Sequence, residues 1–170
     1  MIEASYWSAK VRPSLIKTCQ KLGFRHHFER VENGVADGTP DVDYLIETVA
    51  GKIELKYTDS NPKQELTPVL GKGKGLRRSQ IIYASRYSWA GGLIWCLIGT
   101  PKESWLIDLR GKTPEEMDYI ALMNTVQLRK ASTWHSLNEP VDALPLALLE
   151  KGYPAALLRA GKRKLENVEP

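Results

Sequence analysis

Residues 38–57 read GTPDVDYLIETVAGKIELKY, and this stretch decides the fold. It opens with dense turn chemistry around Gly38 and Pro40, followed by two runs of β-forming residues at 41–49 and 52–57. Ala50-Gly51 separates the two runs, and a glycine between β-rich runs favours a turn. We therefore expect an antiparallel pair of strands joined at Ala50-Gly51.

The second run carries an acid and an amine two positions apart, Glu54 and Lys56. Because side chains alternate along a strand, both project from one face, while Ile53, Leu55 and Tyr57 point to the other. Each feature taken singly is more typical of a solvated strand face with a weak ion pair, and an Asp after Pro is common in turns. It is the combination with Asp41, at the start of the neighbouring strand, that indicates a functional site.

If Asp41 approaches Glu54, two carboxylates converge on one point. Mg²⁺ takes one or two carboxylates from a protein and keeps several waters, so this pair suits it, with the Leu55 carbonyl as a further ligand. A hairpin that turns at Ala50-Gly51 places Asp41 opposite Ser60, whereas opposition to Glu54 requires a turn near Glu47-Thr48. Either the connection between the two strands is longer than a turn at Ala50-Gly51, or a bulge and strand twist bring the two acids together.

The residues Pro40-Asp41 and Glu54-Leu55-Lys56 resemble the motif of the PD-(D/E)xK nuclease superfamily. Residues 3–110 further resemble the small phage and bacterial VRR-NUC branch and the Holliday-junction-resolvase-like nucleases. The features shared with that branch are Glu3 followed by Tyr6-Trp7, the run Arg30-Val31-Glu32, and Arg77-Arg78-Ser79-Gln80.

The resemblance implies roles for individual residues. Asp41 and Glu54 would ligate the metal, Lys56 would be the catalytic lysine, and Gln80 would lie near the phosphate or near Lys56. Glu3 and Glu32 compete for the role of an additional acid that positions water. Mg²⁺ is the implied cofactor, and Mn²⁺ is expected to substitute.

The resemblance also implies an α/β fold, with a restriction-endonuclease-like core in which a central mixed sheet is flanked by helices. Residue patterns agree with it: a helix over 2–22 interrupted at Pro13, an extended run at 24–31, a helix over 76–89, strands at 93–99 and 104–109, and helices at 113–124 and 144–150. We expect residues 1–110 to form the core. Residues 111–170 are expected to be a helical extension of the same domain with a frayed basic tail.

The net charge of +4 is small, but its distribution is uneven. Residues 1–60 hold 8 basic and 9 acidic residues, whereas residues 61–90 hold 6 and 1. The run 71–75, GKGKG, reads as a flexible basic arm, since loose loops rich in Lys attract phosphates. We expect a DNA contact there and nearby, formed by Arg30, Lys72, Lys74, Arg77 and Arg78.

Other features set limits on the function. Cys19 and Cys96 are too few for a disulfide framework, which fits the cytoplasm of a bacterium or of a phage-infected host. The N-terminus lacks the pattern of a signal peptide, and the apolar run 93–98 is too short to span a membrane, so we expect no membrane partner. The tryptophans Trp89, Trp95 and Trp105 stand in apolar contexts and are expected in the core.

The sequence thus predicts a metal-dependent DNA endonuclease that selects branched or junction DNA in replication, recombination or repair. A phage gene is the expected source of such an enzyme. A homodimer that places two sites on two strands is part of this expectation. The alternative is a non-catalytic DNA-binding module that retains the fold.

Overall fold

The computed structural model describes residues 3–31, 37–137 and 143–149. Its N-terminal helix is continuous but irregular: α1 spans Glu3–Tyr6, a π-helical turn spans Trp7–Val11, and α2 spans Arg12–Leu22. The predicted interruption near Pro13 takes the form of this π-helical turn, which lets Pro13 occupy the first turn of α2, where a missing N–H costs least. Gly23 ends α2 in a left-handed conformation, as predicted.

A six-stranded mixed sheet forms the centre, in the order β1-β2-β3-β4-β5-β6. The β3–β4 pair is parallel and the other neighbours are antiparallel. The parallel step requires a crossover, which α3 (Arg78–Trp89) supplies. This confirms the expected α/β class, and the strands are β1 (His26–Arg30), β2 (Val42–Ile46), β3 (Val49–Tyr57), β4 (Leu93–Gly99), β5 (Glu103–Asp108) and β6 (Trp134–Leu137).

The turn between β2 and β3 differs from the prediction. The strands pair from Val42↔Ile53 to Ile46↔Val49, so the turn is Glu47-Thr48 and not Ala50-Gly51. Glu47 has φ 54°, and its carboxylate accepts a hydrogen bond from the backbone N–H of Arg25 at 2.6 Å. Gly51 instead lies inside β3 against the ring of Tyr44, because a glycine within a strand permits close approach.

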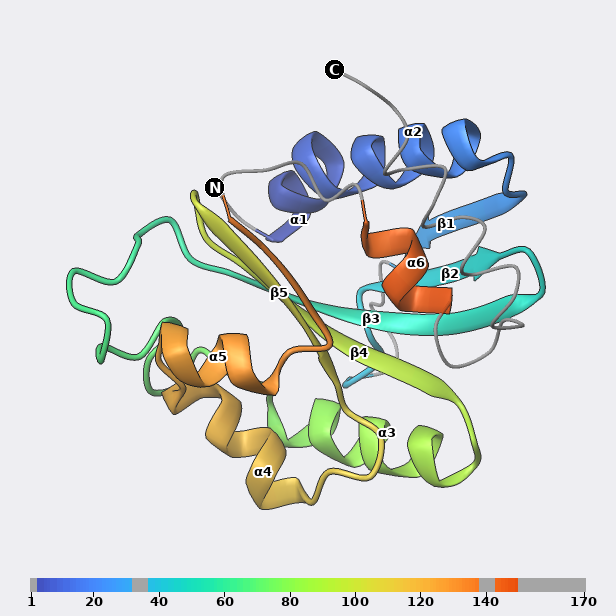
Figure 1. The fold of residues 1–170 in the computed structure, drawn as a ribbon. Coiled ribbons are helices and arrows are strands. Elements are labelled where there is room, and N and C mark those ends of the chain that lie inside the picture. The colour runs from blue at the N-terminus through green and yellow to red at the C-terminus, as the bar shows by residue number, and fades with distance from the viewer. Residues whose placement is uncertain (1–2, 32–36, 138–142, 150–170) are drawn as a thin grey trace.

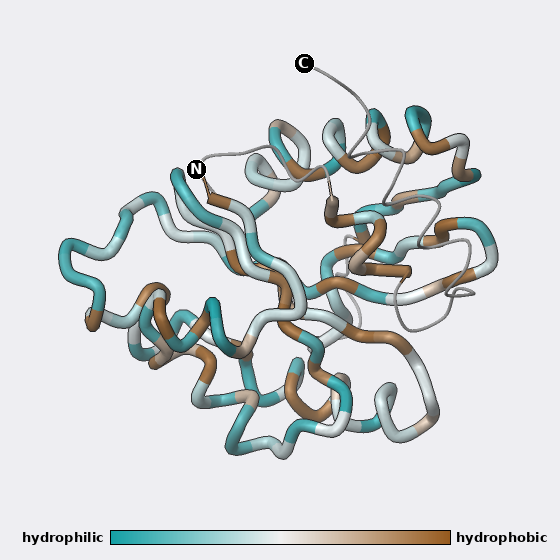
Figure 2. Tube along the Cα trace, viewed as in Figure 1, coloured by the Kyte–Doolittle hydropathy of each residue, from teal (hydrophilic) through white to brown (hydrophobic). Residues whose placement is uncertain are grey.

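Helices cover both faces of the sheet (Figure 1). On one face lie α1, α2 and α6 (Leu144–Leu149), and on the other lie α3, α4 (Pro114–Tyr119) and α5 (Thr125–Ala131). Hydrophobic residues follow the middle of β4 and α6 (Figure 2). The buried hydrophobic residues form two clusters, one on each face of the sheet, and the strands lie between these two cores.

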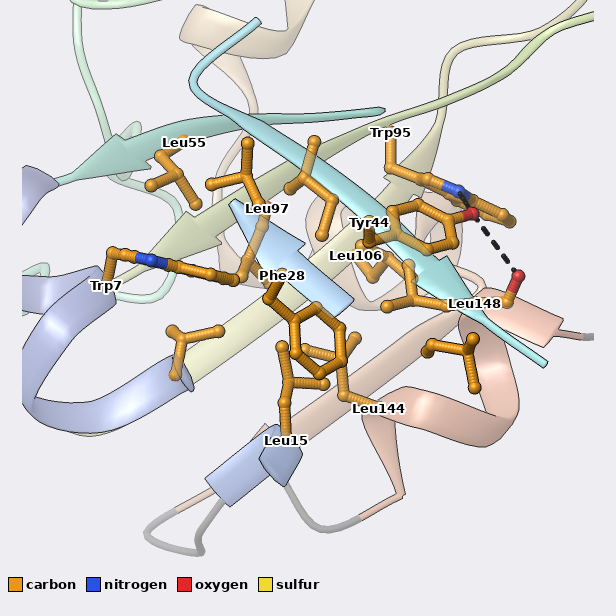
Figure 3. Close-up of a cluster of buried hydrophobic side chains, with 14 of the residues drawn as sticks. Trp7, Leu15, Phe28, Tyr44, Leu55, Trp95, Leu97, Leu106, Leu144 and Leu148 are labelled. Carbon is orange, nitrogen blue, oxygen red and sulfur yellow. Dashed lines mark hydrogen bonds between the residues drawn. The ribbon is translucent and has the colours of Figure 1, made fainter. Parts of the chain in front are cut away.

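The first core contains a hydrogen-bonded chain of buried aromatic groups. Trp95 donates its indole N–H to the Tyr44 hydroxyl at 2.9 Å, and that hydroxyl donates to the Leu148 carbonyl at 3.4 Å (Figure 3). Leu15 and Leu144 meet in the same cluster, which ties the helices α2 and α6 to the sheet. A buried indole or phenol needs such a partner to offset the loss of water.

The described residues after 110 are mainly helical, in line with the predicted helical extension, but they also contribute one strand that was not predicted. Thr113 caps α4 as expected, but the helical segment ends in a 3₁₀ turn at Ile120–Leu122, and Asn124 caps the separate helix α5. The edge strand β6 then pairs with β5. The burial of its residues alternates from one to the next, as expected for a strand. With 4 residues, the strand is too short for this alternation to be recognised in the sequence. The predicted frayed tail lies outside the described residues.

The segment from 58 to 77 contains no helix or named strand, as predicted, but it is not a free arm. Val69, Leu70 and Leu76 are buried in the second core, and the backbone N–H groups of Val69 and Gly71 bond to the carbonyls of Met123 and Ala121. Its apolar residues thus dock the segment, and the composition-based prediction of a flexible arm overlooked them.

Two of the three tryptophans expected in the core are there, with Trp95 and Trp105 fully buried. Trp89 is 91% exposed at the end of α3, so the prediction for it was wrong. Within the described residues, no helix combines the length and the apolar character needed to cross a bilayer.

The first prediction concerns Gly51. A Cβ atom there would overlap the Tyr44 ring, so Gly51→Ala should lower the free energy of unfolding by about 1–3 kcal/mol through overpacking. The neighbouring Ala50 is exposed, so Ala50→Ser should change it by less than about 0.5 kcal/mol. Urea unfolding of both variants checks this; equal stabilities would contradict the strand position of Gly51.

Candidate active site

Strand β3 places Glu54 and Lys56 on the sheet face that α3 covers, as the alternation of side chains predicts. Their neighbours on β4 are Cys96 and Ile98, which belong to the core on that face. Glu54 is 2% exposed and Lys56 is 7% exposed. The pair is therefore buried and is not a solvated ion pair on the surface of a strand.

The corrected hairpin register places Asp41 beside these residues. Val42 pairs with Ile53, so Asp41, one residue before β2, lies opposite Glu54. The Asp41 carboxylate accepts a hydrogen bond from the backbone N–H of Leu55 at 2.8 Å. Because the N–H and C=O of one strand residue point to the same side, the Leu55 carbonyl also faces Asp41.

The two oxygens of the Glu54 carboxylate have different surroundings. Its Oε1 accepts hydrogen bonds from Lys56 Nζ at 2.7 Å and from Gln80 Nε2. Its Oε2 is buried and has no hydrogen-bond partner among the described residues. A buried carboxylate oxygen without a donor is costly, and a bound cation would remove that cost.

Gln80 orients Glu54 through a link to the start of α3. Its amide oxygen accepts a hydrogen bond from the backbone N–H of Arg77 at 2.8 Å, and its amide nitrogen donates to Glu54. The side chain is 5% exposed. Gln80 thus contacts the acid and not Lys56, which the resemblance offered as one of its two partners.

The pKa of Glu54 is raised to about 8, chiefly by burial; Lys56 opposes this rise and the nearby Asp41 adds to it. Burial also lowers the pKa of the Lys56 amine, but the contact with Glu54 outweighs it, so the pKa of Lys56 is above its ordinary value. The lysine therefore keeps its positive charge in the metal-free protein, and Glu54 holds its proton more tightly than a solvated carboxyl would.

Of the two competing acids, the structure brings Glu3 to the site. Its carboxylate lies 3.8 Å from Lys56 Nζ. Burial raises the pKa of Glu3, Lys56 lowers it and Asp41 raises it, which places all three groups within electrostatic reach of one another. Glu32 lies outside the described residues, and Arg30 is an exposed residue at the end of β1.

Sequence reasoning treated Gly38 only as a turn residue, but it fixes the approach of Asp41 to α3. Gly38 has φ 92°, and a Cβ there would lie 2.5 Å from the backbone oxygen of Ser79. The glycine therefore lets the loop before β2 pack directly on the helix that carries Gln80. The sequence did contain a hint of this role, because Gly38 stands three residues before Asp41.

The donor set fits a hard divalent cation that retains water. No group of three or more His, Cys, Asp or Glu side chains that could hold a metal is found in the described ranges. Asp41, Glu54 and the Leu55 carbonyl supply two carboxylates and one neutral oxygen, which is enough for Mg²⁺. The Glu54 Oε2 atom, which has no partner within the described ranges, marks where a cation would satisfy the site.

Four of the five basic residues proposed for DNA contact, Lys72, Lys74, Arg77 and Arg78, lie in the segment that leads into α3 or at its first residue. Lys72 and Lys74 are exposed in the docked segment, beside glycines with φ 85° and 79°. Arg77, at the N-terminus of α3, lies 3.5 Å from Asp37 and acts electrostatically on Glu3. Arg78 is exposed one residue later. The charge of Arg77 therefore acts on the acidic site.

No family model matches the chain, and no curated protein matches it either. Among solved structures, the chain is similar to Hjc, a Holliday junction resolvase from the archaeal hyperthermophile Archaeoglobus fulgidus. The two are 14% identical with a TM-score of 0.46, over 79% of this chain and 96% of the resolvase chain.

The second prediction concerns Glu54 in the metal-free protein. Because its pKa in the folded protein, about 8, exceeds the ordinary 4.5, the folded protein binds a proton that the unfolded chain has released between these pH values. Stability is therefore lost as pH rises through this window. Glu54→Gln should remove that loss, and its stability relative to wild type should increase with pH by about 1–3 kcal/mol.

Urea unfolding at pH 5 and pH 8.5 in chelator measures this difference. Asp43→Asn is the matched control, since that carboxylate lies on β2 and bonds to Lys52 in a half-exposed position. A difference between Glu54→Gln and wild type that does not change with pH would contradict the raised pKa.

Proposed function

We propose that this chain is a metal-dependent DNA endonuclease of the PD-(D/E)xK type, related to the VRR-NUC branch. The observation that carries the proposal is the buried Glu54 with Asp41 opposite it. Lys56 and Gln80 bond to one oxygen of Glu54, and the other oxygen has no partner in the part of the chain that the structure describes. A purely structural carboxylate would be destabilising in this place, because it is buried, faces a second acid and has one oxygen that finds no donor among the described residues.

Each residue has a distinct task in this proposal. Asp41, Glu54 and the Leu55 carbonyl would hold Mg²⁺, with Mn²⁺ able to replace it. When bound, the metal supplies a Lewis acid that polarises the phosphodiester and lowers the pKa of a water. Lys56 holds a positive charge where the scissile phosphate gains negative charge, and Gln80 keeps Glu54 oriented.

Glu3 has the better-supported claim to the role of the additional acid. It lies at the start of α1, 3.8 Å from Lys56, and burial raises its pKa, so it can accept a proton from an attacking water more readily than an exposed acid. Glu32 remains the competing candidate.

We further propose that the substrate is branched or junction DNA. All strands among the described residues belong to one sheet, with helices on both of its faces, so no separate module in this part of the chain reads base sequence. Recognition then rests on DNA shape and phosphates, which the basic residues near α3 can contact. A homodimer that acts on two strands, and a role in recombination or repair of phage or bacterial DNA, belong to the same proposal.

The third prediction tests catalysis. Wild type should cut branched, flapped or junction DNA with Mg²⁺ or Mn²⁺ and not with chelator. Asp41→Asn and Lys56→Gln should each reduce the rate by at least about 100-fold, because each removes a group that stabilises charge in the transition state. Asp43→Asn, on β2 two residues after Asp41, should cut at the wild-type rate.

Gel assays with single-stranded, duplex and branched substrates give the readout. Lack of metal-dependent cleavage of every substrate would refute the enzyme. Salt-sensitive binding without cleavage would support the non-catalytic DNA-binding alternative. Thermal stabilisation by Mg²⁺ that is lost in Glu54→Gln but kept in Asp43→Asn would locate the metal independently of activity.

The fourth prediction concerns the docked basic segment. The double change Lys72→Gln and Lys74→Gln should weaken DNA binding and flatten the plot of log affinity against log salt by up to about 2, since each phosphate contact contributes about 0.9. Lys17→Gln with Lys21→Gln removes the same charge from α2, where both residues are exposed, and should leave the slope unchanged. Equal salt slopes for the two double variants would show that the segment does not contact DNA.

A further inference from the structure

The outward side of α3 differs from an ordinary solvent-facing helix side. The exposed residues of α3 are Arg78, Ile82, Arg86 and Trp89, and their spacing of three or four positions places them in one stripe along the helix. Ile82 is 43% exposed and Trp89 is 91% exposed. A helix side that faces only water is usually polar, whereas Trp and Arg are the residues that most often anchor a contact with a partner. The stripe therefore indicates a binding surface.

A groove of about 470 Å³ runs along α3 beside this stripe, from Ser79 to Ala90. Tyr83 and Tyr87 line it, so we call it the tyrosine groove. Their rings stack with centroids 5.8 Å apart, and Lys52 Nζ lies 5.7 Å from the Tyr87 centroid. The two half-buried rings thus form a firm wall, and a wall of this kind suits the flat rings and sugars of a nucleic acid strand.

The charge on this side of α3 suits a polyanion. The helix contains two arginines and no acidic residue. Asp37, the acid in the lining of the tyrosine groove, already lies 3.5 Å from Arg77. The guanidinium groups of Arg78 and Arg86 form no hydrogen bond or ion pair with another described residue. These two arginines are about 12 Å apart along the helix, which is the spacing of about three or four stacked nucleotides.

A second groove, between α3 and α4, is less suited to a polyanion. Arg78 and Arg86 line one wall of it, but Glu115 and Asp118 line the opposite wall, so its charges balance. None of its described lining residues is aromatic. A polyanion is therefore favoured on the stripe and in the tyrosine groove, and not between the two helices.

One end of the tyrosine groove lies next to the proposed reaction centre. Ser79 lines this end and directly precedes Gln80, which bonds to Glu54. The opposite end is at Ala90, beside Trp89 in the chain. The helix has 12 residues and is therefore about 18 Å long, which is the length of about five stacked nucleotides. A strand that leaves the reaction centre along α3 reaches Trp89 within that length.

We propose that the stripe and the tyrosine groove bind a single-stranded arm of the DNA substrate. An unpaired base stacks on Trp89, the nucleotides before it follow the tyrosine groove, and their phosphates contact Arg78 and Arg86. The inference rests on the proposed nuclease function and deepens it, because it names the part of a branched substrate that is held beside the cut. Bases in a duplex are already stacked on one another, so an exposed indole distinguishes a single strand from a duplex.

Binding in chelator tests this surface without catalysis. The probes are one duplex, blunt or with a 5′ or 3′ single-stranded arm of three, six or twelve nucleotides. For one of the two polarities, wild type should bind the six-nucleotide arm at least about tenfold more tightly than the blunt duplex. The gain should level off between six and twelve nucleotides, because α3 spans about five.

Two variants should remove this gain. Trp89→Ala should weaken binding of the armed probe by at least about fivefold, the effect of losing one base–aromatic stack, and leave binding of the blunt duplex unchanged. Arg86→Gln should also weaken binding of the armed probe, and its plot of log affinity against log salt should be flatter by about 0.7, the share of one phosphate contact on a single strand.

The controls remove similar side chains from other surfaces. Leu137→Ala removes an exposed apolar side chain from β6, and Arg12→Gln removes an exposed arginine from α2. Both variants should bind every probe as wild type does. Because Trp89 is 91% exposed, Trp89→Ala should keep the wild-type melting temperature, so its loss of binding reports the surface and not the fold.

Other outcomes would overturn the proposal. Equal affinity of wild type for armed and blunt probes, or an armed-probe affinity that Trp89→Ala does not change, would refute the arm-binding surface. A dimer in sedimentation that Trp89→Ala converts to a monomer, with DNA binding unchanged, would assign the stripe to a second copy of the chain and also refute it.

Cleavage assays separate this inference from the function on which it rests. Metal-dependent cleavage by wild type alongside equal binding of armed and blunt probes would refute the arm-binding surface and keep the nuclease. A preference for the armed probe that depends on Trp89, without cleavage of any substrate, would keep the surface and refute the nuclease.

Discussion

The register between β2 and β3 is the constraint on which the site depends. A turn at Glu47-Thr48 sets Asp41 opposite Glu54, and a slip of one residue would move one acid to the other face of the sheet. Glu47 holds a left-handed conformation that costs a non-glycine residue about 1–2 kcal/mol. Its hydrogen bond to Arg25 and the pairing of five residues on each strand offset that cost.

Much of the fold follows from sequence patterns, and the main errors have physical causes. The helix ending at Gly23, the strands of the hairpin, the apolar strand at 93–99 and the capped helix at Thr113 were predicted, because each has a local signal. The turn was misplaced because Gly51 is the stronger turn residue by composition, yet it serves the close approach of Tyr44. Strand β6 and the docking of the loop after β3 depend on contacts with distant residues, which local patterns cannot supply.

The candidate site was predictable to a different extent for each residue. The spacing of Glu54 and Lys56 fixed their common face. The presence of Gln80 at the site came only from resemblance, and its contact with Glu54, which depends on how α3 packs, was not predicted. Glu3 precedes Lys56 by more than fifty residues, so only the folded chain shows that they approach to 3.8 Å.

Gly38 couples the parts of the site mechanically. It holds the loop that carries Asp41 against the backbone of Ser79, one residue from Gln80, with no space for a side chain. Larger residues at position 38 would act as a wedge that separates the acid-bearing loop from α3, although position 38 has no functional group of its own. Tolerance to substitution at this position therefore reports how closely two distant segments must fit, and not what chemistry they perform.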